Sequence, residues 1–143
     1  NIEVKNLPGD PDHAQAPVVV DEIVAMVTER DLASTTLISS FHIDSVDRVK
    51  ARAPHLSTGW LVLEGGAVAS IVERAAGHGH QAIHPHVSLV DRAFVERSHD
   101  ADLQVMVWTV DDPDRAQELI DLRVDGIITN TPQPIRELVD AAG

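Results

Sequence analysis

Two charged residues near the start of the chain could do chemistry together. Glu3 and Lys5 lie two positions apart in the alternating run at residues 2–5. In a β-strand both side chains would leave the same face, about 6 to 7 Å apart. Near the carboxyl end of a strand in a parallel barrel, a carboxylate can bind a hard cation and a lysine can contact a phosphate. An ordinary ion pair, or an edge strand with charged residues facing solvent, would explain the same pattern.

Polar and aromatic residues also follow the later strand-like segments. They are Ser40-Phe41-His42, Glu64, His84-Pro85-His86, Trp108-Thr109-Val110-Asp111 and Thr129-Asn130. Because parallel strands present their carboxyl ends at one mouth, we expect these groups to surround a single site. Trp108 shares a strand face with Met106 and Val110, so it could form the floor of a ligand pocket, or it could simply pack in the core.

The histidines offer a second kind of site. His84 and His86 lie two apart, and imidazoles on one strand face can share a zinc ion. Pro85 lies between them, however, and no other histidine or aspartate has a spacing that completes a ligand set. We expect the remaining candidates to lie on the surface, namely His78, His80 and His99. Gly65-Gly66 lacks the spacing of a dinucleotide-binding or P-loop glycine motif.

Six short segments have the apolar or alternating pattern of β-strands. They are residues 2–5, 36–41, 57–63, 81–84, 103–110 and 126–129. A segment with helical periodicity follows each of them. The predicted helices are residues 17–30, 44–53, 68–77, 88–98, one that opens at Asp112-Pro113, and one that carries Ile135, Leu138, Val139 and Ala142 on one face.

This alternation of strand and helix predicts a parallel α/β sheet in a single domain, residues 1–143. Two architectures fit the pattern: an open doubly wound sheet, or a (β/α) barrel cut short. A whole barrel needs eight units and typically about 250 residues. The first strand pattern begins at residue 1 without a start signal, which favours a truncated barrel.

Composition excludes several classes of function. The formal charge of −12, from 11 basic and 23 acidic residues, opposes binding to nucleic acid. No stretch approaches the roughly 20 consecutive apolar residues of a transmembrane helix. The absence of cysteine excludes disulfides and thiolate chemistry and leaves the cellular compartment open.

Four segments, in order, resemble motifs of the glycerophosphodiester phosphodiesterase family of (β/α)8 barrels. Residues 1–5 resemble the family's third-strand motif, and Ser39-Ser40-Phe41 resemble the end of its fourth strand. Residues 107–110 (Val-Trp-Thr-Val) resemble the motif of its seventh strand, and residues 124–132 resemble that of its eighth. The resemblance implies a TIM-type (β/α)8 barrel that is incomplete in this chain, with about six β/α units, the third to the eighth. Residues 1–143 would then be the carboxy-terminal part of a single barrel domain.

The resemblance also implies a reaction, the hydrolysis of a glycerophosphodiester to glycerol 3-phosphate and an alcohol with a divalent cation, Mg²⁺ or Ca²⁺. By position, Glu3 looks like a metal ligand and Lys5 like a phosphate contact. Phe41 and Trp108 resemble the apolar wall beside the glycerol part of the substrate. The cation and the ammonium group would offset charge that develops on the phosphoryl group.

The family's acid and base histidines and its other carboxylate ligands have no counterpart here and would lie upstream of Asn1. We therefore expect this chain alone to be inactive, and a missing amino-terminal barrel segment to be needed for closure of the sheet. A different class of function also fits the sequence: a non-catalytic barrel remnant that acts as a binding or interaction module.

Overall fold

The computed structural model describes residues 1–7, 9–11, 13–63 and 66–142. In these residues strands and helices alternate as the sequence predicts. The elements are β1 Ile2–Val4, α1 Ala16–Glu29, β2 Leu37–Ser40, α2 Ile43–Arg52, β3 Ser57–Val62, α3 Val68–Gly77, β4 Ala82–Pro85, α4 Arg92–Asp100, β5 Gln104–Val107, α5 Pro113–Asp121, β6 Gly126–Ile127 and α6 Pro132–Ala142. Short 3₁₀ turns precede α1, β2 and α4.

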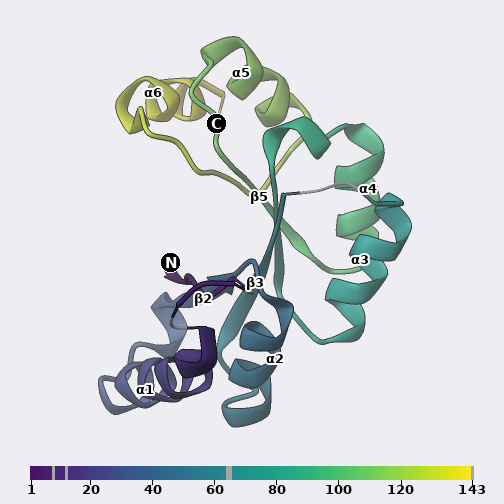
Figure 1. Cartoon of the computed structure of the whole chain (residues 1–143). Helices are drawn as coiled ribbons and strands as arrows, with labels where there is room; N and C mark the ends of the chain where they lie inside the picture. The colour runs from purple at the N-terminus through teal and green to yellow at the C-terminus, as the bar shows by residue number, and fades with distance from the viewer. Residues whose placement is uncertain (8, 12, 64–65, 143) are drawn as a thin grey trace.

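All strand pairs are parallel, and the strands follow one another in the sheet in chain order from β1 to β6. A doubly wound sheet would contain a point where the strand order reverses. The helices form an arc along one side of the curled sheet, and an open side remains between α1 and α6 at the two ends of the arc (Figure 1). The architecture is therefore an incomplete TIM-type (β/α) barrel.

The core lies between the sheet and this arc of helices. One cluster joins Val4 and Ile38 of the first two strands to Val20 and Val27 of α1. A larger cluster lies under α3 to α6 and includes the fully buried Phe94. None of the helices in the described residues is long and apolar enough to cross a membrane.

Capping residues explain where two of the helices begin. The Asp112 carboxylate accepts a hydrogen bond from the Asp114 amide, and Pro113 is the first residue of α5, as the sequence predicts. The predicted helix at residues 88–98 is wrong in its start. That region contains a 3₁₀ turn and then α4, because the Asp91 carboxylate caps a new helix by accepting from the Phe94 amide at 2.8 Å.

Candidate functional site

The concave face of the sheet carries Glu3 and Lys5. Val4, which lies between them, is buried against α1, so strand alternation turns both charged side chains to the opposite face. The structure thus places the two residues on one face, and both are exposed. Glu3 lies level with Ser39 of β2, which in turn pairs with Gly59 of β3.

A buried polar network fixes the chain just after Lys5. The Asn6 side chain is nearly inaccessible, and its Nδ2 donates to Ser45 Oγ at 2.7 Å. Ser40 Oγ lies 2.8 Å from the Val4 carbonyl oxygen and 3.1 Å from Asn6 Oδ1, and can donate to either. These contacts tie the end of β1 to β2 and α2, so they restrict where the Lys5 ammonium group can reach.

Phe41 and Trp108 come together at the carboxyl ends of β2 and β5. Their rings meet edge to face with centroids 5.3 Å apart. Trp108 Nε1 donates to the His84 carbonyl oxygen at 2.7 Å, which fixes the indole. His86 packs against the same indole at 5.0 Å. The sequence placed His86 at the mouth and offered it as a metal ligand, but it missed this aromatic contact.

The loops after β5 and β6 are joined at the same rim. The Asp111 carboxylate accepts hydrogen bonds from Thr129 Oγ1, the Asn130 amide and Asn130 Nδ2, at 2.8 to 2.9 Å. These hydrogen bonds, chiefly that from the Asn130 side chain, hold the pKa of Asp111 below its usual value. The two polar segments therefore lie beside each other, as expected for a common mouth. Glu64, which the sequence also placed there, lies outside the described residues.

His84 points into the concave side of the sheet rather than to solvent. Its side chain is almost fully buried, and neither ring nitrogen has a hydrogen-bond partner within the described part of the chain. Burial lowers the pKa of His84 to about 4. Ser39 Oγ is likewise buried without a partner among the described residues. Within the same residues, His84 and His86 belong to no set of three close metal-ligating atoms.

One group in the described residues could hold a divalent metal ion, and it lies elsewhere. Asp47 of α2, His78 at the end of α3 and His80 before β4 have ligand atoms within 4.8 Å of one another. The expectation that His80 lies on the surface is wrong. Gly79, at φ 75°, turns the chain so that His80 enters the space beneath α2 and is 5% exposed. His78 and His99 are exposed, as expected.

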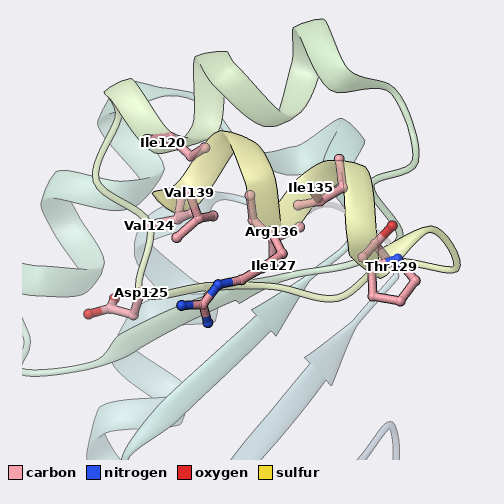
Figure 2. A pocket seen from close by; sticks show the side chains of 10 residues that line it. Ile120, Val124, Asp125, Ile127, Thr129, Ile135, Arg136 and Val139 are labelled. Carbon is pink, nitrogen blue, oxygen red and sulfur yellow. The ribbon is translucent and has the colours of Figure 1, made fainter. Parts of the chain in front are cut away.

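Both free edges of the sheet adjoin hollows. The larger, about 490 Å³, lies beside β6, and its apolar lining comes mainly from Ile120, Val124, Ile127, Ile135 and Val139. Figure 2 shows Ile135, Arg136 and Val139 of α6 projecting toward the segment that carries Val124 and Ile127. A smaller hollow, about 130 Å³, lies beside β1 and is lined by residues of β1 and α1 that include Glu3 and Lys5.

A run of parallel β/α units around a concave face, with a polar and aromatic rim at the strands' carboxyl ends, defines part of a TIM-type (β/α) barrel. Residues 1–133 match the model of the glycerophosphoryl diester phosphodiesterase family. The chain belongs to this family. The four ordered motifs read from the sequence therefore identified the family correctly.

Individual relatives agree with the family assignment. A glycerophosphodiester phosphodiesterase of Caldanaerobacter subterraneus subsp. tengcongensis is 29% identical over 130 residues, which cover 89% of this chain and 51% of the relative. The fold matches the crystal structure of a glycerophosphodiester phosphodiesterase from Parabacteroides distasonis, with a TM-score of 0.82 and 24% identity over 99% of this chain and 57% of that one. It also matches the structure of an Oleispira antarctica phosphodiesterase in complex with the product sn-glycerol-3-phosphate, with a TM-score of 0.82 and 23% identity over 98% of this chain and 54% of that one. The chain spans about half the length of these relatives.

Proposed function

We propose that residues 1–143 are the carboxy-terminal part of a barrel domain that hydrolyses glycerophosphodiesters to glycerol 3-phosphate and an alcohol. The observation that carries this proposal is the shared concave site. Glu3 of β1 and Lys5 just after it face this site, while Phe41 and Trp108 meet at its rim. A family match over residues 1–133 supports the same reaction.

In this proposal Glu3 is a ligand of Mg²⁺ or Ca²⁺, because a carboxylate oxygen suits a hard cation. The exposed Glu3 side chain on the concave face is free to take that role, but one carboxylate rarely retains Mg²⁺ without partner ligands. When bound, the cation would polarise the phosphoryl oxygens. Lys5 would contact the phosphate, and Phe41 and Trp108 would form the apolar wall beside the glycerol part.

Closure of the barrel is the second part of the proposal. Parallel sheets are normally covered on both faces, and unpaired strand edges invite further pairing. Here both edges adjoin hollows, and the flanking helices expose Val18 and Val19 of α1 and Val139 of α6, each more than 40% accessible. We propose that an amino-terminal barrel segment covers these surfaces and supplies the acid and base histidines and the other carboxylates. Residues 1–143 alone are then expected to be inactive.

The test is an assay of the protein in its full encoded length on glycerophosphocholine with Mg²⁺ or Ca²⁺. Glu3→Ala should lower kcat/KM at least about 100-fold, as loss of a group that stabilises transition-state charge does. Glu22→Ala, which removes an exposed carboxylate from α1, is the matched control. Full activity in Glu3→Ala would refute the metal assignment. Absence of hydrolysis in the full-length wild type would instead favour the non-catalytic binding module.

A further inference from the structure

We propose that Asp47, His78 and His80 form a binding site for a transition-metal dication of the zinc class, on the helix-covered side of the sheet. The three residues come from α2, from the end of α3 and from the turn that enters β4. The site is separate from the concave face that carries Glu3. It goes beyond the proposed hydrolysis and does not depend on it.

The ligand atoms are already close to the spacing of a tetrahedral site. Both oxygens of Asp47 lie 2.8 Å from His78 Nδ1, and Oδ1 lies 3.2 Å from His80 Nε2. With metal bonds of about 2.0–2.1 Å, neighbouring ligand atoms around tetrahedral zinc stand about 3.3 Å apart. The third pair, His78 with His80, has ligand atoms within 4.8 Å of each other, so small movements of the side chains would bring all three ligands to this spacing.

His80 behaves as a preorganised ligand. Its side chain is completely buried, and among the described residues Nε2 has no hydrogen-bond partner, although it lies 3.2 Å from Asp47 Oδ1. Nδ1 lies 3.0 Å from Thr58 Oγ1 in β3, a contact that orients the ring as the outer partners of metal-bound histidines do. When Nδ1 donates to this hydroxyl, Nε2 presents its lone pair to the carboxylate oxygen. A cation between the two atoms would turn that repulsion into attraction.

One nearby charge opposes a cation: the Lys50 ammonium group, which is held by the Leu56 carbonyl oxygen at 2.7 Å and by Gln81 Oε1 at 2.6 Å. The Asp47 carboxylate supplies a negative charge within the ligand set itself.

The donor set selects the class of ion. Two imidazole nitrogens and one carboxylate suit zinc, copper, nickel or iron, whereas Mg²⁺ and Ca²⁺ take oxygen ligands. Three protein ligands leave a fourth position for water or another ligand. Because α2 and the turn between α3 and β4 would then share one ion, metal binding should also stabilise the fold.

The experiment is a titration of the metal-free, full-length protein with Co²⁺, followed by visible absorption, with Zn²⁺ as competitor. We expect one equivalent of tetrahedral Co²⁺ that Zn²⁺ displaces, and an affinity at least about tenfold lower in His78→Ala and in Asp47→Asn. His99→Ala is the matched control, because His99 is an exposed histidine paired with one carboxylate, Asp125, at 2.9 Å. Its affinity should equal that of the wild type.

A second measurement reports on the fold. Zn²⁺ should raise the melting temperature of the wild type and of His99→Ala, and raise that of His78→Ala much less. Absence of a stoichiometric site in the wild type, or unchanged affinity in both His78→Ala and Asp47→Asn, would overturn the proposal. Hydrolysis of glycerophosphocholine does not enter either readout, so the two proposals fail separately.

Discussion

The imidazole ring of His84 lies against the backbone of Gly59, so that a Cβ atom at position 59 would stand only 2.4 Å from Nε2. Gly59 belongs to β3 and His84 to β4, and both face the concave side of the sheet. The missing side chain of glycine is therefore what makes room for a buried histidine. Packing at Gly59 therefore directly affects the surroundings of a titratable side chain, that of His84.

Gly59→Ala should destabilise the fold, because the methyl group must displace the His84 ring from a closely packed interior. We expect a loss of about 1–3 kcal/mol in the free energy of unfolding, the usual range for overpacking. Urea denaturation measures it. Gly66→Ala is the control, since a Cβ there would meet no atom of the described residues within 4 Å. The double variant Gly59→Ala/His84→Ala should lose less than the sum of its single changes; strict additivity would contradict the contact.

Acid should weaken the fold through His84. Burial lowers its pKa to about 4, below the usual histidine value of 6.5, so the unfolded chain binds the proton more readily than the folded one. This contribution to stability is present above pH 6.5 and is lost as the pH falls toward 4. It amounts to about 3 kcal/mol at most, at 1.36 kcal/mol per pKa unit.

The check is the free energy of unfolding between pH 7 and pH 4. In His84→Asn the free energy of unfolding should fall less than in the wild type as the pH is lowered through this range. In His55→Asn, which replaces an exposed histidine, it should fall as much as in the wild type. An equal slope in the wild type and in His84→Asn would show that another group is responsible.

The order of strands and helices could be predicted because each element carries its own periodic pattern. The alternation at residues 2–5 predicted β1, in which Val4 is buried. The helical spacing that includes Val20 and Val27 predicted the buried face of α1. Alternation also placed Glu3 and Lys5 on one face. The start of α4 was missed because Asp91 caps a helix inside a segment whose apolar spacing continues through it.

The group of Asp47, His78 and His80 shows what a single sequence does not reveal. The spacing of His78 and His80 is visible, but their common direction depends on the positive φ of Gly79. Asp47 lies 31 positions from His78, and only the packing of α2 brings it near. The burial of His80 follows from the same packing, which local polarity does not predict.

Trp108 should contribute to substrate binding if the proposed hydrolysis is correct. Trp108→Ala removes the ring that meets Phe41 and the hydrogen bond to the His84 carbonyl oxygen. We expect KM for glycerophosphocholine to rise by roughly tenfold, which corresponds to a loss of about 1.4 kcal/mol in binding free energy. Trp108→Phe keeps an apolar ring and should lose less.

The second tryptophan offers a matched control for that measurement. Trp60 Nε1 donates to the Phe41 carbonyl oxygen at 3.2 Å, but its ring lies under the Arg74 guanidinium group and not against the Phe41 ring. Trp60→Phe should leave KM within about twofold of the wild type. An equal rise in KM in both variants would mean that loss of a tryptophan disturbs the fold generally, and would remove Trp108 from the proposed apolar wall.

Asp111 should hold the loop after β6 in place. Its carboxylate accepts from the Asn130 amide and side chain and from Thr129 Oγ1, so Asp111→Ala would release all three donors. We expect the Asn130 amide to exchange with solvent several-fold to about tenfold faster, as loss of one hydrogen bond allows. Because these bonds lower the pKa of Asp111, the same loosening should appear in the wild type only when the pH falls below 3.8, the usual value for an aspartate. Asp114→Ala, which removes a carboxylate outside this network, controls for the change in charge, and hydrogen exchange at Asn130 that is equal in the two variants would contradict the proposed role of Asp111.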